Sequence, residues 1–154
     1  MTNQIPPYSG TAGFLHAALF YVRNMPVIRK GLEKRNLDFK LALDEPGFRN
    51  AALMVFKDGD FRIVPLSDED VDDSTKWDAK MSAPGRILFD FFLGEYPIIP
   101  TLVLGKVKVT PYFMGLLRLL KLLWFVKILR KIYNRNKSLS NAVYSKLKDF
   151  ASME

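Results

Sequence analysis

The chain has 154 residues, of which 49% are hydrophobic and 13% aromatic, so it is long enough for one domain with a substantial core and too apolar for a disordered chain. It contains no cysteine, which excludes a disulfide framework, a thiolate zinc site and a thiol nucleophile. The net charge is +7, and the positive excess lies in residues 102–154, which carry eleven Lys and Arg against two Asp and Glu, so this segment is expected to meet an anionic partner.

The N-terminal part of the chain predicts a flexible lead-in followed by a helix. Residues 1–12 hold two prolines and a glycine and no periodic pattern. Over residues 13–35 apolar positions recur every three or four residues, which predicts an amphipathic helix that Pro26 kinks or divides. No basic residue precedes the apolar stretch at 14–22 and no small-residue cleavage site follows it, so a signal peptide is not expected. These features and the missing cysteines are compatible with a cytoplasmic protein, which is the location we predict.

The middle of the chain predicts strands. Apolar residues alternate or run together at 39–43, 51–56, 61–66 and 77–81, as they do in half-buried strands. Asp58-Gly59 lies between the second and third runs and is a strong signal for a tight hairpin. The acidic stretch that follows lacks the ligand spacing and central glycine of an EF-hand, so we expect a solvated loop at residues 67–74.

Three elements are predicted after the acidic loop. A short helix at residues 84–93 begins with Pro84, which suits a first helical turn. Residues 103–109 alternate as a last strand, and Pro111 begins a long basic helix that polar residues should end at 134–140. The order of elements predicts an α+β domain with a mostly antiparallel sheet.

The expected domain covers residues 13–133. Residues 134–154 are predicted to be a basic, partly helical C-terminal extension.

Catalytic patterns are lacking. His16, the single histidine, lies in the apolar face of the first predicted helix and is expected to be structural. Nucleophile-elbow, metalloprotease and phosphate-loop spacings do not occur. We therefore expect no catalytic residue, no metal site and no cofactor, and an interior suited to binding an apolar ligand rather than to turnover.

The basic helix contains the segment GLLRLLKLLWFVKILRK at residues 115–131. Three cations lie near its middle: Arg118, Lys121 and Lys127. Each raises the free energy of inserting the helix into a bilayer by about 3 kcal/mol, whereas some eleven apolar residues lower it by only about 0.5 kcal/mol each. A transmembrane span is therefore not expected. Leucines stand where a DNA-reading helix would carry Asn, Gln, Ser or Arg, so nucleic acid is not expected either. Two alternatives stay open: a helix with one face on the domain and the other on an anionic membrane, or a helix docked on the sheet with solvated lysines.

Four segments carry a resemblance to a known family: FKLAL at residues 39–43, LMVFKDGDFRIVP at 53–65, WDAKMSAPGRILFDFFLGEYP at 77–97 and LGKVKVT at 104–110. In this order they resemble the sterol carrier protein 2 (SCP2) family, over roughly residues 31–120. The resemblance implies a five-stranded sheet covered by helices around a hydrophobic pocket. It also implies a non-enzymatic protein that binds and transfers a sterol, a fatty acyl chain or a phospholipid.

Two sets of site residues follow from this hypothesis. The predicted pocket lining consists of Phe39, Leu41, Leu53, Val55, Phe61, Ile63, Trp77, Met81, Ile87, Phe91, Phe92, Val107, Leu119 and Leu122. The residues predicted to meet an anionic membrane surface are Arg118, Lys121, Trp124, Lys127, Arg130 and Lys131. The alternative function is a non-enzymatic adaptor with a filled core, whose basic helix binds a partner protein or a membrane surface.

Overall fold

The computed structural model describes residues 22–45, 51–93 and 97–138, and the single positions Ala12, Leu15, Ala18, Leu19, Asn141, Ala142 and Ser145. The predicted lead-in before Ala12, His16 and nearly all of the predicted segment from residue 139 onward lie outside the described residues. The domain boundaries proposed from the sequence therefore stay predictions.

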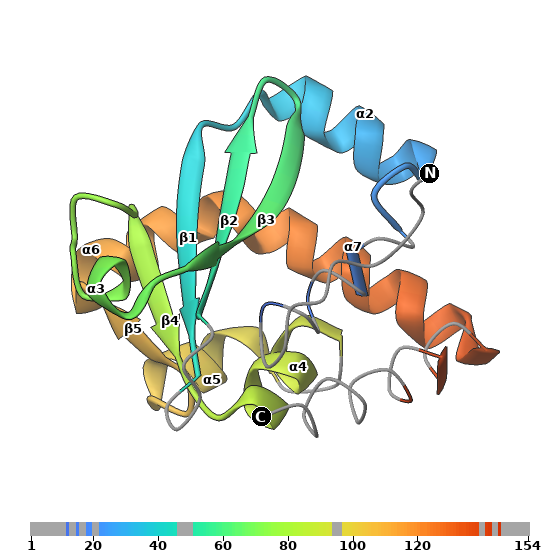
Figure 1. Cartoon of the computed structure of the whole chain (residues 1–154). Coiled ribbons are helices and arrows are strands. Elements are labelled where there is room, and N and C mark those ends of the chain that lie inside the picture. The colour runs from blue at the N-terminus through green and yellow to red at the C-terminus, as the bar shows by residue number, and fades with distance from the viewer. Residues whose placement is uncertain are drawn as a thin grey trace.

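Five strands form one sheet in the order β3-β2-β1-β4-β5 (Figure 1). The strands are β1 (Phe39–Asp44), β2 (Ala51–Lys57), β3 (Asp60–Leu66), β4 (Ala79–Ser82) and β5 (Lys108–Thr110). β1 and β4 are parallel, and the other neighbouring pairs are antiparallel. The predicted α+β class and the five-stranded, mostly antiparallel sheet are confirmed.

The helices pack mainly on one face of this sheet. They are α2 (Pro26–Arg35), α3 (Asp68–Val71), α4 (Gly85–Leu93), α5 (Ile98–Val103), α6 (Tyr112–Leu119) and α7 (Leu123–Arg135), with a 3₁₀ turn, η1 (Leu120–Leu122), between the last two. α7 runs behind the sheet, between α2 above and α4 below (Figure 1). Pro26 is the first residue of α2. Its missing N–H costs nothing there, because the first N–H groups of a helix have no intrahelical acceptor.

The sheet has a large apolar layer on its helix-covered face and a small one on the other. The large layer includes Met54 and Phe56 of β2 together with buried residues of α2, α4, α6 and α7. The small layer consists of Ala42, Ala51, Leu66, Val71 and Trp77, with Leu53 packed against it. Because successive side chains of a strand point to opposite faces, Leu53 lies on the side away from most of the helices.

The β2–β3 hairpin turns where the sequence predicts. Asp58 and Gly59 have φ values of 54° and 72°, the left-handed conformation that a two-residue type I′ turn requires at both positions. Asp60 follows the turn and accepts hydrogen bonds from Arg23 at 3.1 Å and from Arg29 of α2 at 2.8 Å. Partial burial acts to raise the pKa of Asp60, but the Arg23 hydrogen bond, the Phe61 N–H and both guanidinium charges outweigh it and lower that pKa. The hairpin is thereby held against the N-terminal end of α2.

Two predicted elements differ in the structure. The acidic loop contains the short helix α3, which Ser67 caps by accepting a hydrogen bond from the Asp70 N–H at 3.1 Å. The last strand is only three residues long. Val103 belongs to the helix α5, and Gly105 has a φ of 81°, which excludes an extended run through this position.

The segment before β5 is the helix α5, not the break that its two prolines suggest. Pro97 is its N-cap and Pro100 lies in its first turn, where proline is tolerated. The long basic helix is also divided, by η1. No helix within the described part of the chain is long and apolar enough to span a membrane.

Packing between α2 and α7 depends on Gly31. A β-carbon built at Gly31 would lie 2.6 Å from Cζ3 of Trp124, closer than side-chain contacts allow. We expect Gly31→Ala to lower the free energy of unfolding by about 1 kcal/mol, because overpacking costs about 1–3 kcal/mol and the better helix propensity of alanine returns about 1. Urea denaturation measures this difference.

The matched control is Lys30→Ala, one position earlier on α2 and exposed. It should change the free energy of unfolding by less than about 0.5 kcal/mol. If Gly31→Ala is as stable as this control or more stable, the Trp124 ring is not held against α2 in the way described.

Candidate functional site

A cavity of about 200 Å³ lies between α4, α5 and the α6–η1 segment, and is here named the α4–α6 pocket. It is lined by Leu41, Met81, Phe91, Phe92, Ile98, Ile99, Leu102, Val103, Leu116, Leu117, Leu119, Leu120, Leu122, Leu123 and Val126. The thioether of Met81 is the most polar side chain among them. The pocket therefore offers dispersion contacts and no charged or hydrogen-bonding side chain.

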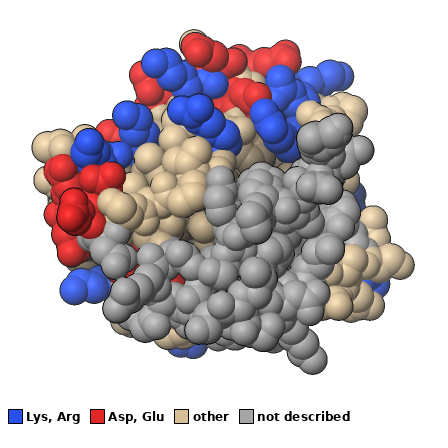
Figure 2. All heavy atoms as spheres, viewed as in Figure 1, with Lys and Arg blue, Asp and Glu red and all other residues tan. Residues whose placement is uncertain are grey.

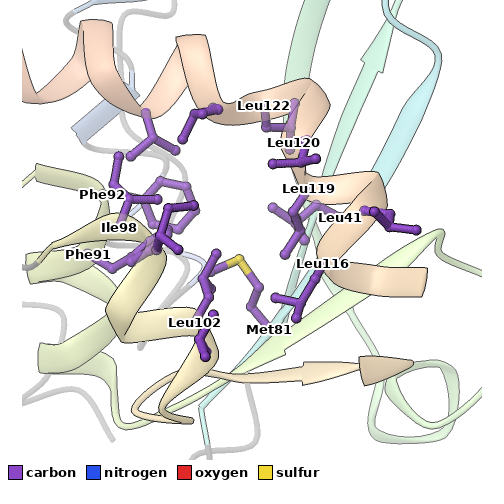
Figure 3. A pocket seen from close by; sticks show the side chains of 15 residues that line it. Leu41, Met81, Phe91, Phe92, Ile98, Leu102, Leu116, Leu119, Leu120 and Leu122 are labelled. Atoms are coloured by element: carbon purple, nitrogen blue, oxygen red, sulfur yellow. The ribbon is translucent and has the colours of Figure 1, made fainter. Parts of the chain in front are cut away.

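Two helical walls and the two interior strands β1 and β4 of the sheet line this space. Figure 3 shows Phe91, Phe92, Ile98 and Leu102 of α4 and α5 facing Leu119, Leu120 and Leu122 of α6 and η1 across an open centre. Leu41 of β1 and Met81 of β4 add the sheet's contribution. These two residues lie on paired parallel strands, so the pocket sits where the sheet changes from antiparallel to parallel pairing.

The position of the α6 wall follows from Gly115. A β-carbon at Gly115 would lie 2.7 Å from Cγ1 of Val109, so a larger residue would push α6 away from β5. The start of α6 is also linked to the end of α5, because the Tyr112 hydroxyl donates to the Val103 carbonyl at 3.4 Å. These contacts keep the two walls of the pocket next to each other.

The α4 wall is held from behind by Arg130 of α7. Its Nε donates to the Phe91 carbonyl at 2.9 Å, its Nη2 donates to the same oxygen, and its guanidinium lies 5.6 Å from the Phe91 ring centre. Burial lowers the pKa of Arg130 from its ordinary value, and an arginine stays charged at neutral pH despite such a shift. A charged, doubly donating group therefore fixes the end of α4 to α7.

Six of the residues predicted to line a pocket do line this one. They are Leu41, Met81, Phe91, Phe92, Leu119 and Leu122. That they bind a ligand stays a prediction.

The other eight predicted pocket residues lie elsewhere. Phe39, Phe61, Ile63 and Val107 belong to the large core, and Ile87 packs against it. Trp77 and Leu53 belong to the small layer on the opposite face of the sheet. Val55 is half-buried and, two residues after Leu53, points to that same face. Side chains on the opposite face cannot reach the α4–α6 pocket.

Nine lining residues were missed by the sequence prediction: Ile98, Ile99, Leu102, Val103, Leu116, Leu117, Leu120, Leu123 and Val126. Four of them belong to α5, a helix that the sequence analysis does not predict. A signal for α5 was present, because Pro97 and Pro100 occupy positions that a first helical turn accepts. The other five lie on the basic segment, where leucines on every side do not identify the inner face.

The residues predicted to meet a membrane divide into two groups. Lys121, Lys127 and Lys131 are exposed. Arg118 instead donates to the Asp78 carbonyl at 2.7 Å, and Arg130 binds Phe91 as described above.

Trp124 also faces the protein. The Arg35 guanidinium lies 4.2 Å from the centre of its ring. Its indole Nε1 is buried and has no hydrogen-bond partner among the described residues. Arg118, Trp124 and Arg130 thus contact other parts of the fold, and the membrane role expected for all six residues stays a prediction.

Comparisons with known proteins find similar solved structures at low sequence identity. No protein-family model and no curated protein sequence matches the chain. The solved structure "UbiJ-SCP2 Ubiquinone synthesis protein" is similar with 17% identity and a TM-score of 0.46, over 75% of this chain and 91% of that one. The sterol carrier protein domain 2 of Helicoverpa armigera is similar with 14% identity and a TM-score of 0.46, over 74% of this chain and 89% of that one.

The contact between Arg130 and Phe91 generates a stability prediction. Arg130→Met keeps much of the apolar stem but removes both donors to the Phe91 carbonyl. The free energy of unfolding should fall by about 1–3 kcal/mol, the cost of leaving a buried acceptor unsatisfied. Urea denaturation measures the loss.

Lys131→Met is the control, because Lys131 is the adjacent cation of α7 and is exposed. Its effect should stay within about 0.5 kcal/mol. Equal urea midpoints for the two variants would contradict a role of Arg130 in holding α4.

Proposed function

We propose that this protein binds the apolar chain of a lipid in the α4–α6 pocket and carries it to or from membranes. The observation that carries the proposal is the pocket itself, a cavity of about 200 Å³ whose fifteen lining residues are all Leu, Ile, Val, Phe or Met. Each methylene that moves from water into such a site gains about 0.8 kcal/mol. Binding energy would therefore scale with chain length.

The size of the pocket favours a single chain over a fused ring system. Sites for drug-sized ligands usually measure about 300–1,000 Å³, and this cavity is about 200 Å³. A segment of a fatty acyl or isoprenyl chain fits that volume better than the four rings of a sterol. Among the ligands that the sequence resemblance implies, we therefore propose a fatty acyl chain, free or in a phospholipid.

The chemistry of the lining supports binding rather than turnover. General acid–base or nucleophilic catalysis needs a titratable or nucleophilic group within hydrogen-bonding distance of the reacting atom. The side chains around this pocket are hydrocarbon apart from one thioether. An open pocket also weighs against the alternative of an adaptor with a filled core.

Contact with an anionic membrane belongs to the same proposal. Lys121, Lys127 and Lys131 are exposed on η1 and α7, and a cation near an anionic leaflet contributes about 1 kcal/mol. Together they would supply a reversible attachment of a few kcal/mol. The protein would then act as a cytoplasmic, peripherally attached carrier.

Filling the pocket should abolish ligand binding. Leu116 lines the pocket and is half-buried, so the larger indole of Leu116→Trp would occupy space that a chain needs. We expect at least a tenfold weaker affinity for a fluorescent polyene fatty acid, equivalent to about 1.4 kcal/mol. Fluorescence titration measures the affinity, and solvent extraction with mass spectrometry shows whether the purified wild type retains a lipid that the variant lacks.

Leu53→Trp is the matched control, because Leu53 is also half-buried but lies in the small layer on the opposite face of the sheet. It should bind the fatty acid as the wild type does. Undiminished binding by Leu116→Trp would place the ligand elsewhere and refute the proposed site.

A further inference from the structure

Exposed large apolar side chains are concentrated around the α4–α6 pocket. Nine such side chains occur among the described residues, and one of them, Val27, lies on α2. The other eight, here named the pocket rim, are Ile99, Val103, Leu104, Tyr112, Phe113, Met114, Leu117 and Leu120. Leu104 is 80% exposed and Phe113 is 68% exposed. Clustered exposure of this kind marks an interaction surface, whereas a single exposed residue such as Val27 does not.

The rim and the pocket are continuous. Ile99, Val103, Leu117 and Leu120 are exposed and also line the cavity, so the cavity opens to the outside between α5 and α6. The hydrogen bond from Tyr112 to the Val103 carbonyl places the start of α6 beside the end of α5. A molecule that leaves the pocket therefore passes directly over the rim.

The charged residues in the segment of the chain that carries the rim all have one sign. Residues 96–148 contain no Asp or Glu but include eleven Lys and Arg. Lys108 and Lys121 within this stretch are exposed close to the rim in the sequence. On the face drawn in Figure 2, acidic residues lie beside Lys and Arg over α2 and the hairpin end of β2 and β3, and gather near α3.

We propose that the pocket rim docks on an anionic lipid bilayer, with α5 and α6 lying in its interface, so that the pocket opens into the acyl region of one leaflet. An apolar surface on a segment that carries cations and no acidic residue complements a layer of hydrocarbon beneath phosphate headgroups. A protein partner covering the same surface would close the mouth of the pocket, whereas a bilayer would supply its ligand. The identity of the ligand rests on the proposed function, but the docking surface stands on exposure and charge alone.

Docking through the rim differs from docking through the outer face of α7. Trp124 and Arg130 of α7 are half-buried and make contacts within the protein. Exposed lysines of η1 and α7 would add attraction to anionic headgroups but no apolar insertion. The inserted residues are therefore those of α5 and α6, together with Leu104, which follows α5.

The test compares two charge-matched double variants in co-sedimentation with vesicles of phosphatidylcholine and phosphatidylglycerol. The rim variant is Leu104→Glu with Phe113→Glu; both residues are exposed and neither lines the pocket. We expect it to bind the vesicles at least about tenfold more weakly than wild type, because withdrawing even one large apolar side chain from the interface is worth such a factor. The control is Asn24→Glu with Val27→Glu, which adds the same charge at exposed positions near the start of α2 and should retain most of the binding. Equal losses in the two variants, or no binding of wild type, would overturn the proposal.

A second measurement does not depend on adding charge. Phe113→Trp should show tryptophan emission that vesicles with brominated acyl chains quench more strongly than they quench the wild type, which contains only Trp77 and Trp124. No additional quenching would overturn the proposal. A rim that instead pairs two copies of the chain would give a dimer that the rim variant converts to a monomer, which would also overturn it.

Failure of this proposal can be told apart from failure of the proposed function. The rim variant should still bind the fluorescent fatty acid in solution, because its substitutions leave the lining unchanged. Leu116→Trp should still bind vesicles, because Leu116 is not one of the rim residues. Loss of vesicle binding with fatty acid binding retained is the expected result for the rim variant, and the reverse is expected for Leu116→Trp.

Discussion

The packing of Phe125 against the sheet positions most of the elements that form the site. This side chain is fully buried on α7 and meets the rings of Phe56 and Phe61 edge-on, each with centroids 5.3 Å away. Such contacts add about 0.5–1.5 kcal/mol to the burial of the rings themselves and restrict their orientation. With α7 fixed at this point, Arg130 reaches Phe91 of α4 and Val126 reaches the pocket. The pocket is therefore a consequence of how one helix lies on β2 and β3.

The position of α7 on the sheet determines which cationic side chains are exposed to solvent. Trp124 precedes Phe125, so its ring turns toward Gly31 of α2 and receives the Arg35 guanidinium. Arg130 lies over the end of α4, and only lysines remain on the outer surface among the residues predicted to meet a membrane. Arginine suits this role because its planar guanidinium can donate two hydrogen bonds to one carbonyl oxygen and also stack on an aromatic ring. The division between structural arginines and solvent-facing lysines follows from that difference.

The sheet was predictable because its signals are local, whereas the site depends on packing. Asp58-Gly59 specifies its hairpin through the conformation of two residues. By contrast, the run ALMVF in β2 is apolar on both faces, so periodicity alone could not decide whether Leu53 or Met54 meets the helices. Pro97 and Pro100 fit either a break or a first helical turn. The pocket residues missed by the sequence prediction lie in segments whose sequence is compatible with two local structures, and tertiary contacts determine which of the two forms.

The composition of α6 explains why a pocket and an exposed apolar rim occur together. Its sequence, YFMGLLRL, contains one charged residue, Arg118, and that side chain turns to the Asp78 carbonyl. A helix that is hydrophobic all round is normally buried on every side. Here Gly115 and Leu119 face the protein, while Phe113 and Leu117 are exposed on the other side of the helix. Water is a poor environment for that outer face, and an apolar environment that covers it would meet the mouth of the pocket at the same time. The helix that walls the cavity is thus also the one whose outer face favours a membrane interface.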